Sequence, residues 1–298
     1  MSRLDARVAI VTGAGGGLGR AHALLLAAQG ARVVVNDLGE AAHGVVDEIT
    51  AQGGEAIAGL GSVAEFETAE AIVANAVRAW GRVDILVNNA GILRDKSFLK
   101  MDLADFRLVL DVHLMGAVHC TKAAWGIMRE QRYGRIVMTT SSSGLWGNFG
   151  QSNYGAAKMA LVGLMQTLAL EGASHGIRVN CIAPTAATKM MDGILPPGML
   201  DLLRPELVSP ALLPLVAEDA PTRTILCAGA GGFETANITL TPGAYIPDVD
   251  QAPEQVIARW PAIVDRAGDM TIEQGLAQSR LELTKAGYRF DEMEDMQR

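Results

Sequence analysis

Two side chains near the start of a long apolar segment have the types and spacing of an acid/base pair. Tyr154 and Lys158 lie four positions apart in "GQSNYGAAKMALVGLMQTLALEG", residues 150–172. Residues at i and i+4 of a helix are neighbours on one face, and an ammonium beside a phenol favours the phenolate. We therefore expect Lys158 to lower the pKa of Tyr154 from about 10 toward the working range of a general acid/base. Taken alone, the pair also fits a buried tyrosine and a lysine that extends its ammonium to solvent.

A serine precedes this pair by thirteen residues. Ser141 follows the apolar run in "IVMTTSSSG". In open α/β sheets, ligands bind at the carboxyl ends of the strands, so we expect the Ser141 hydroxyl to hydrogen-bond a substrate carbonyl beside the phenol. Ser142 and Ser143 are interpreted as turn and capping residues.

A glycine-rich turn near the N-terminus has the features of a phosphate cradle. "TGAGGGLGR", residues 12–20, joins the apolar run "RVAIVT" to the helical pattern "AHALLLAAQG". Glycines let the backbone turn sharply and let a pyrophosphate approach the amides at a helix N-terminus, where the helix dipole favours negative charge. A tight turn without a ligand is the alternative.

Asp37 ends the next apolar run, "VVVND", about twenty residues after the glycines. An acidic side chain at this place can accept a hydrogen bond from a ribose 2′-hydroxyl and repels a 2′-phosphate. The sequence therefore favours NAD over NADP. Arg20, beside the glycine turn, is a residue that could instead meet a phosphate.

The elements that must position these residues alternate along the chain. Nearly continuous apolar runs, as in strands buried on both faces of a sheet, occur at residues 7–12, 31–37, 55–60, 84–89, 134–140 and 177–183. Amphipathic segments, including 64–80 and 104–128, lie between them. This alternation predicts an α/β fold with a Rossmann-type, doubly wound parallel sheet.

The pattern changes after Pro184. Residues 185–208 are rich in Pro, Met and small residues, which fits either a mobile loop over a ligand site or a plain connector. From about Thr241 a tail follows, with helical patterns over 254–259, broken near Pro261, and over 271–285. We expect one α/β domain of Rossmann type at 1–241 and a helical extension at 242–298 packed on it.

Composition excludes several classes of function. The chain has 298 residues, 49% of them hydrophobic, and a formal net charge of −8. An acidic chain has no global field that attracts nucleic acid or an anionic membrane. The three scattered cysteines suggest neither a disulfide framework nor a metal site. Neither a secretory signal nor an apolar stretch long enough to span a membrane is evident, so we expect a cytoplasmic protein.

Four motifs in register carry a resemblance to a known family. "TGAGGGLG", "NNAG" at 88–91, Ser141 and "YGAAK" at 154–158 resemble the short-chain dehydrogenase/reductase family. "VVVNDLG", "NNAGILRDKSF", "GRIVMTTSSSGLWGNFGQSNYGAAK" and "APEQVIARW" are similar to one subgroup, the (3R)-hydroxyacyl-CoA dehydrogenase part of the type 2 peroxisomal multifunctional enzymes, also known as a 17β-hydroxysteroid dehydrogenase. The resemblance extends over essentially the whole chain.

The resemblance implies hydride transfer between NAD and a secondary alcohol or ketone. Tyr154 would exchange the proton, Lys158 would support its ionisation and bind the nicotinamide ribose, and Ser141 would orient the substrate oxygen. The implied cofactor-binding residues are Gly13, Gly16, Gly17, Leu18, Gly19, Asp37, Ser62, Val63, Asn88, Asn89, Ala90, Gly91, Tyr154, Lys158, Pro184 and Thr188.

This chain departs from the family pattern at three places. His113 in "DVHLMG" stands where much of the family has a catalytic asparagine, a substitution that the subgroup shares. His113 is thus a candidate catalytic residue, unless a main-chain carbonyl or a held water plays the role. Thr185 replaces the usual glycine after Pro184. The insertion after "NDLG" and the further hydratase and sterol-carrier domains of the multifunctional enzymes are lacking, so the resemblance implies a stand-alone dehydrogenase.

Two other classes of function share some of these sequence features. A methyltransferase also uses a glycine turn and an acidic residue, and a dinucleotide sensor would bind without catalysis; neither explains Ser141, Tyr154 and Lys158 together. Among dehydrogenases, a (3R)-3-hydroxyacyl-CoA, a hydroxysteroid and an acyl-carrier-protein thioester all offer suitable chemistry. The basic residues Arg94, Lys96 and Lys100 would suit a CoA phosphate or simply face solvent.

The helix that carries Tyr154 also predicts self-association. "MALVGLMQTLAL", residues 159–170, is apolar on nearly every side, so one sheet face cannot cover it. We expect a homodimer or homotetramer, although the tail is a second possible cover.

Overall fold

The computed structural model describes residues 4–187 and 197–290. The chain divides into two compact units, Met1–Ala236 and Asn237–Arg298, which are described separately.

The first unit is built on an eight-stranded sheet. Its strands lie in the order β3-β2-β1-β4-β5-β6-β7-β8, and all neighbours are parallel except β7 and β8. The strands are β1 (Val8–Val11), β2 (Arg32–Asp37), β3 (Ala56–Leu60), β4 (Ile85–Asn88), β5 (Gly134–Thr139), β6 (Ile177–Thr185), β7 (Ile225–Gly229) and β8 (Gly232–Ala236). The predicted doubly wound α/β fold is confirmed, with β1 to β6 at the six predicted runs. The strand order reverses between β1 and β4, which opens a crevice at their carboxyl ends.

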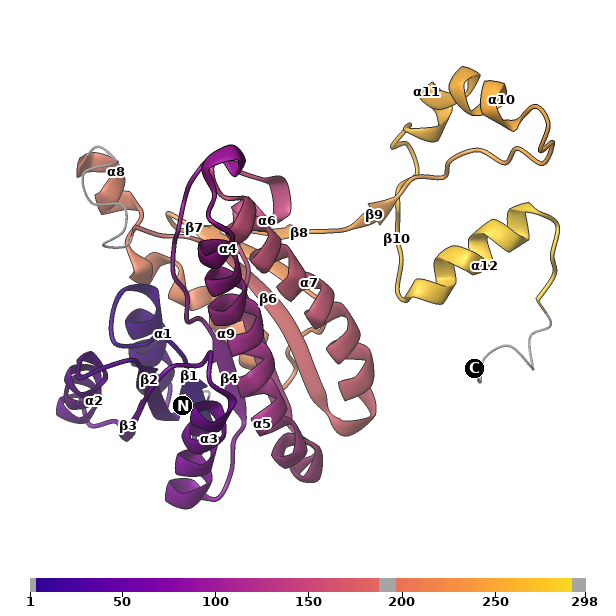
Figure 1. Ribbon diagram of the computed structural model, residues 1–298. Coiled ribbons are helices and arrows are strands. Elements are labelled where there is room, and N and C mark those ends of the chain that lie inside the picture. The colour runs from indigo at the N-terminus through magenta and orange to yellow at the C-terminus, as the bar shows by residue number, and fades with distance from the viewer. Residues whose placement is uncertain (1–3, 188–196, 291–298) are drawn as a thin grey trace. The chain divides into compact units, whose positions relative to one another are not determined.

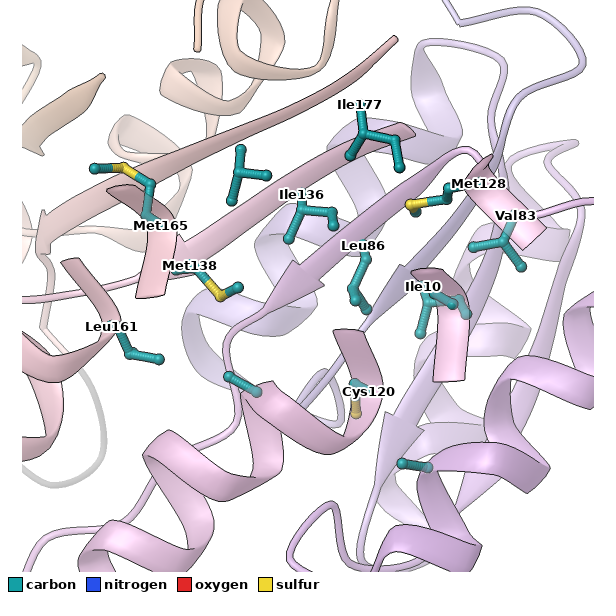
Figure 2. Close-up of a cluster of buried hydrophobic side chains, with 14 of the residues drawn as sticks. Ile10, Val83, Leu86, Cys120, Met128, Ile136, Met138, Leu161, Met165 and Ile177 are labelled. Atoms are coloured by element: carbon teal, nitrogen blue, oxygen red, sulfur yellow. The ribbon is translucent and has the colours of Figure 1, made fainter. Parts of the chain in front are cut away.

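Helices cover both faces of this sheet (Figure 1). On one face pack α1 (Gly17–Ala28), α2 (Ala41–Ala51) and α9 (Leu212–Val216). On the other pack α3 (Phe66–Trp80), α5 (Gly116–Gln131) and α7 (Ser152–Gly172). Figure 2 shows part of this second core, where strand residues such as Leu86 and Ile136 lie among Cys120 of α5 and Leu161 of α7.

The predicted helix over 104–128 has a bulge in its middle. It begins as α4 (Leu103–Leu110), widens into one π-helical turn at Asp111–Met115 and continues as α5. The Asp102 side chain caps α4 by accepting a hydrogen bond from the Ala104 amide at 2.8 Å. A π turn inserts an extra residue into an α-helix, and such turns are frequent at functional sites. His113 lies at the centre of this one.

Short elements join β5 and β6 to the rest of the unit. Ser141 caps α6 (Ser142–Trp146), and α8 (Pro197–Leu202) and 3₁₀ turns at Pro205–Leu207 and Ser209–Ala211 precede α9. Part of the predicted 185–208 loop, residues 188–196, lies outside the described residues.

The second unit is small and open. It contains β9 (Thr239–Leu240), α10 (Ala252–Ala258), α11 (Trp260–Ile263), β10 (Met270–Thr271) and α12 (Gly275–Lys285), with β9 and β10 antiparallel. The break between α10 and α11 falls just before Pro261, as the sequence predicts. None of its described residues, 237–290, is buried. The prediction that this extension packs on the domain stays a prediction.

Every helix within residues 4–187 and 197–290 is too short or too polar to cross a membrane.

Candidate active site

The predicted site residues converge on one cavity. It has a volume of about 620 Å³ and lies where the strand order reverses, at the carboxyl ends of the parallel strands. This volume is typical of a small-molecule or cofactor site. The predicted residues that line it are Gly13, Gly16, Gly17, Leu18, Gly19, Asp37, Ser62, Val63, Asn89, Ala90, Gly91, His113, Ser141, Tyr154, Lys158 and Pro184. Thr188 lies outside the described residues.

The glycine turn is packed tightly against the end of β4. Gly13 has a φ of +62°, and a Cβ there would lie 2.8 Å from the Cα of Ala90. A Cβ on Gly19 would lie 2.2 Å from the carbonyl oxygen of Gly13. The Asn89 side-chain amide donates to the Thr12 carbonyl at 2.9 Å, which ties the "NNAG" segment to the turn. Glycine is therefore required for the shape of the turn itself.

The start of α1 meets the requirements of an anion site. Gly16 is its N-cap residue, no described side chain caps it, and its first turn holds no acidic residue. A Cβ added to Gly16 would meet nothing within 4 Å, so space is open beside the turn. The first amides of a helix have no partners within the helix, and together with the positive end of the helix dipole they favour a phosphate here. The residues present thus fit the pyrophosphate of a dinucleotide.

The Asp37 carboxylate is held in place by two main-chain amides. Its Oδ2 accepts from the Gly15 amide at 2.8 Å and its Oδ1 accepts from the Leu38 amide at 2.7 Å. A Cβ on Gly15 would lie 2.8 Å from Oδ2, so a side chain at residue 15 would displace the carboxylate. Arg20 forms a bidentate ion pair with Glu48 and does not line the cavity. The alternative that Arg20 meets a phosphate of the cofactor is therefore not supported.

Tyr154 and Lys158 lie on successive turns at the start of α7. The Lys158 ammonium is 5.5 Å from the centroid of the Tyr154 ring and donates to the Thr139 carbonyl at 2.5 Å. The Thr140 hydroxyl donates to the Lys158 carbonyl at 2.7 Å, which fixes α7 against the end of β5. Ser141 comes next in the chain, and its hydroxyl accepts from the Ser143 amide at 3.2 Å.

The charges of the pair differ from the sequence prediction. Burial raises the pKa of Tyr154 above its usual value of 10, although the Ser141 hydroxyl partly opposes this shift. Burial also lowers the pKa of Lys158 to about 7. The expectation that Lys158 lowers the tyrosine pKa was therefore wrong for this structure, because desolvation disfavours both charged forms.

His113 contacts the active-site backbone and the Tyr154 ring. Its Nε2 lies 3.0 Å from the amide nitrogen and 2.8 Å from the carbonyl oxygen of Ile92. Its ring meets that of Tyr154 edge to face, with 5.2 Å between centroids. Burial lowers the pKa of His113 to about 3, so the imidazole is neutral near pH 7. These contacts favour a positioning role over titration during turnover.

Some residues lie elsewhere than the sequence reasoning placed them. Asn88 does not line the cavity; its amide donates to the Thr121 hydroxyl at 3.1 Å behind the sheet end. The basic cluster of the 92–101 loop is outside the cavity lining too, and both Arg94 and Lys96 lie within 4 Å of the Asp105 carboxylate.

Other residues that line the cavity were missed or interpreted as structural. They include Thr139, Gln151 and Asn148, together with Ser142 and Ser143. The sequence could have identified Thr139 as a cavity residue, because it ends the strand that leads to Ser141. Among the described residues, no group of three or more His, Cys, Asp or Glu side chains is placed to hold a metal ion.

Comparisons with known proteins agree with this geometry. The family model described as short chain dehydrogenase matches residues 7–196. A short-chain type dehydrogenase/reductase of Mycobacterium tuberculosis is 47% identical over 279 residues, which is 90% of this chain and 97% of that protein. The peroxisomal multifunctional enzyme type 2 of Drosophila melanogaster is 50% identical over 243 residues, 78% of this chain. This chain spans only 40% of the length of that enzyme.

Solved structures give the same picture. The full-length Drosophila enzyme superposes with a TM-score of 0.81 and 40% sequence identity, covering 95% of this chain and 50% of that one. A 7α-hydroxysteroid dehydrogenase complexed with NADH and 7-oxo glycochenodeoxycholic acid superposes with a TM-score of 0.72 and 34% identity, covering 77% and 95% of the two chains. This chain belongs to the short-chain dehydrogenase/reductase family and is an oxidoreductase that acts on CH–OH groups.

Proposed function

We propose that this protein oxidises a (3R)-3-hydroxyacyl-CoA to the 3-oxoacyl-CoA with NAD. One observation carries the proposal of hydride transfer: Ser141, Tyr154 and Lys158 share a single cavity with the glycine turn and Asp37. The cofactor, when bound, supplies the acceptor for the hydride. The protein's own residues must hold the alcohol, take its proton and exclude water.

Three side chains, from the end of β5 and from α7, carry out these steps. The Ser141 hydroxyl donates to the substrate oxygen and sets its position beside the phenol. The Tyr154 oxygen, as phenolate, accepts the hydroxyl proton while the carbon–hydrogen bond breaks, so that a carbonyl forms. Protonated Lys158 offsets the phenolate charge during the transfer. The attraction between the two opposite charges is strong in a buried site and opposes the desolvation that disfavours each charged form on its own. In the reverse direction Tyr154 returns the proton.

Support for the acyl-CoA substrate comes from sequence similarity to the peroxisomal multifunctional enzyme, which covers 78% of this chain. The motif "NNAGILRDKSF" and the 50% identity to the multifunctional enzyme favour a hydroxyacyl thioester. The second candidate is a hydroxysteroid, because the 7α-hydroxysteroid dehydrogenase superposes over 77% of this chain. A 3-oxoacyl-carrier-protein thioester is the third.

Turnover measured at the absorbance band of reduced nicotinamide tests this function. We expect a (3R)-hydroxyacyl-CoA to be oxidised with NAD. The kcat/KM for a 17β- or 7α-hydroxysteroid, and for a 3-hydroxyacyl-carrier protein, should be lower than the kcat/KM for this substrate. Tyr154→Phe should lower kcat by about 10²- to 10⁴-fold, because it removes the acid/base group while the ring stays packed. NAD binding by this variant, measured by calorimetry, should persist. Turnover of the steroid alone would replace the acyl-CoA proposal.

The preference for NAD rests on Asp37. Its carboxylate is held beside the glycine turn by two amides, where a 2′-phosphate would meet a like charge. Asp37→Asn should keep the side-chain shape and lower the ratio of the NADP to the NAD dissociation constant by about tenfold or more. Glu48→Gln is the control, because it removes a nearby negative charge outside the cavity. An equal change in both variants would contradict the role of Asp37.

A further inference from the structure

The hydroxyl of Thr139 is a buried polar group to which neither the acid/base chemistry nor the fold assigns a role. Thr139 is 5% exposed and lines the cavity. Among the described residues, its Oγ1 has no hydrogen-bond partner. A buried hydroxyl without a partner is destabilising, and most such groups in folded proteins are paired. This hydroxyl is therefore suited to a partner that enters from the cavity.

The hydroxyl of the neighbouring residue, Thr140, has a structural role at the same strand end. Thr140 is fully buried, and its hydroxyl donates to the Lys158 carbonyl at 2.7 Å. Side chains alternate between faces along an extended strand, so Thr139 faces the other way, on the side of Val137. Val137 belongs to the core beneath α1 and α9, while Thr140 is turned toward α7. The two hydroxyls thus have separate surroundings.

The strand register places Thr139 at one end of the cavity. Thr139 lies opposite Ile182 of β6, and both strands are parallel. Ile182 is in the same core as Val137, and Pro184 follows it by two residues on the same face and lines the cavity. The Thr139 carbonyl in turn accepts from Lys158. Thr139 therefore lies at the end of the strand next to β6 and three strands away from β2, which carries the Asp37 carboxylate.

We propose that the Thr139 hydroxyl is a binding subsite for the carboxamide of the nicotinamide ring. This inference rests on the proposed function. If Lys158 binds the nicotinamide ribose and Asp37 the adenosine ribose, as the resemblance implies, the ring belongs at the Lys158 end of the cavity, which Pro184 also lines. The phosphates belong at the start of α1, so the polar group that remains for this end is the uncharged carboxamide. It carries both a donor and an acceptor, and a threonine hydroxyl can match either one. A hydrogen bond here would fix the rotation of the ring about the ribose.

Calorimetric titration with NAD and with ADP-ribose, which lacks the nicotinamide, tests this subsite. Thr139→Val should weaken NAD binding by between about twofold and about tenfold, the effect of one neutral hydrogen bond, and leave ADP-ribose binding unchanged. Thr139→Ser keeps the hydroxyl and should retain the wild-type ratio of the two dissociation constants. Thr140→Val is the matched control, because it removes a hydroxyl that the protein itself uses. It should leave that ratio unchanged.

Unfolding of the ligand-free variants gives an independent readout. Thr139→Val should be at least as stable to urea as the wild type, whereas Thr140→Val should be less stable. A loss of stability in Thr139→Val as large as that in Thr140→Val, or its failure to fold while Thr139→Ser folds, would show a structural hydroxyl and overturn the proposal. An unchanged ratio of NAD to ADP-ribose binding would overturn it as well. Failure of the wild type to bind either ligand would refute the proposed function instead.

Discussion

At the scale of single residues, the site is dominated by the burial of its ionisable groups. Lys158 is 3% exposed, and its ammonium has one carbonyl as its hydrogen-bond acceptor among the described residues. Desolvation lowers its pKa to about 7 and raises that of Tyr154. The pair is therefore closer to neutral near pH 7 than two exposed side chains would be, and the protein bears a stability cost for keeping a lysine there.

This cost predicts a pH dependence of stability that a substitution can remove. An unfolded lysine titrates near 10.5 and folded Lys158 near 7, so above pH 7 the unfolded chain binds one more proton than the native state. The free energy of unfolding should then rise with pH, by up to about 1.4 kcal/mol per pH unit from this group. Urea titrations at pH 7 and 9 should show the rise in the wild type and a smaller one in Lys158→Met.

Two buried cysteines set the upper limit of the pH range in which this test can be made. Burial raises the pKa of both Cys120 and Cys181 to about 12, which makes stability fall above pH 9 as the unfolded thiols ionise. Lys122→Met, at an exposed position of α5, is the control and should keep the wild-type slope. The same slope in Lys158→Met and the wild type would show that Lys158 does not carry the shift.

The sequence predicted which residues line one cavity better than it predicted their charge states. Periodicity and motif order identified Tyr154, Lys158 and Ser141, which meet at one cavity. Charge states depend on how completely neighbours exclude water, and those neighbours come from β5, β6 and α7 together. No local pattern reports this exclusion. The sequence places Thr139 at the end of the strand before Ser141, but only the three-dimensional structure shows that its buried hydroxyl has no hydrogen-bond partner among the described residues.

At the scale of elements, the π turn brings a helix and a strand end into contact at the site. His113 lies in that turn, and its ring fills the space that a side chain at residue 91 would need. A Cβ on Gly91 would come within 2.2 Å of the His113 Cε1 atom. The glycine of the "NNAG" motif is thus complementary to the histidine that replaces the usual asparagine.

This complementarity predicts non-additive mutations. Gly91→Ala should cost about 1–3 kcal/mol of unfolding free energy in the wild type, because the extra methyl group overpacks the site. In a His113→Ala background the same change should cost clearly less, since the clashing ring is gone. Urea unfolding of the four proteins gives the coupling energy, and simple additivity would refute the contact.

The elements were predicted well where apolar runs are nearly continuous. β1 to β6 were predicted from such runs, whereas β7 and β8 were missed. β8 reads "GFETA" and is largely exposed, so it does not resemble a strand covered on both faces. β7 has the same length as β3 and is also partly exposed, so nothing in its burial explains why it was missed. The π turn was also missed, because the apolar spacing of residues 104–128 continues through it.

At the scale of the whole molecule, the outer side of α7 is the feature that one chain leaves open. Met159 and Leu170 are 40% and 49% exposed, and Gly163 and Thr167 between them are exposed too. The inward side chains of the helix are buried in the core under Met138 and Ile136. An apolar outer face of this kind is a feature of surfaces that associate.

Light scattering coupled to gel filtration tests association through this face. We expect the wild type to be a dimer or tetramer at micromolar concentration and Leu170→Glu to shift it toward monomer, because a charge would be buried without a partner. Ala51→Glu, at an exposed position of α2, should leave the mass unchanged. A monomeric wild type would refute this prediction.

The strand order also determines when, during synthesis, each part of the site becomes available. β1 pairs with β2 and β4, so the strands that carry the glycine turn and Asp37 are complete once Asn88 has been made. The opposite end of the sheet needs β6 and β7, which end about 140 residues later. At typical rates of translation this gap lasts roughly 7–28 s. A nascent chain therefore contains the strands that carry the glycine turn and Asp37 well before it contains all the strands beside Tyr154 and Lys158.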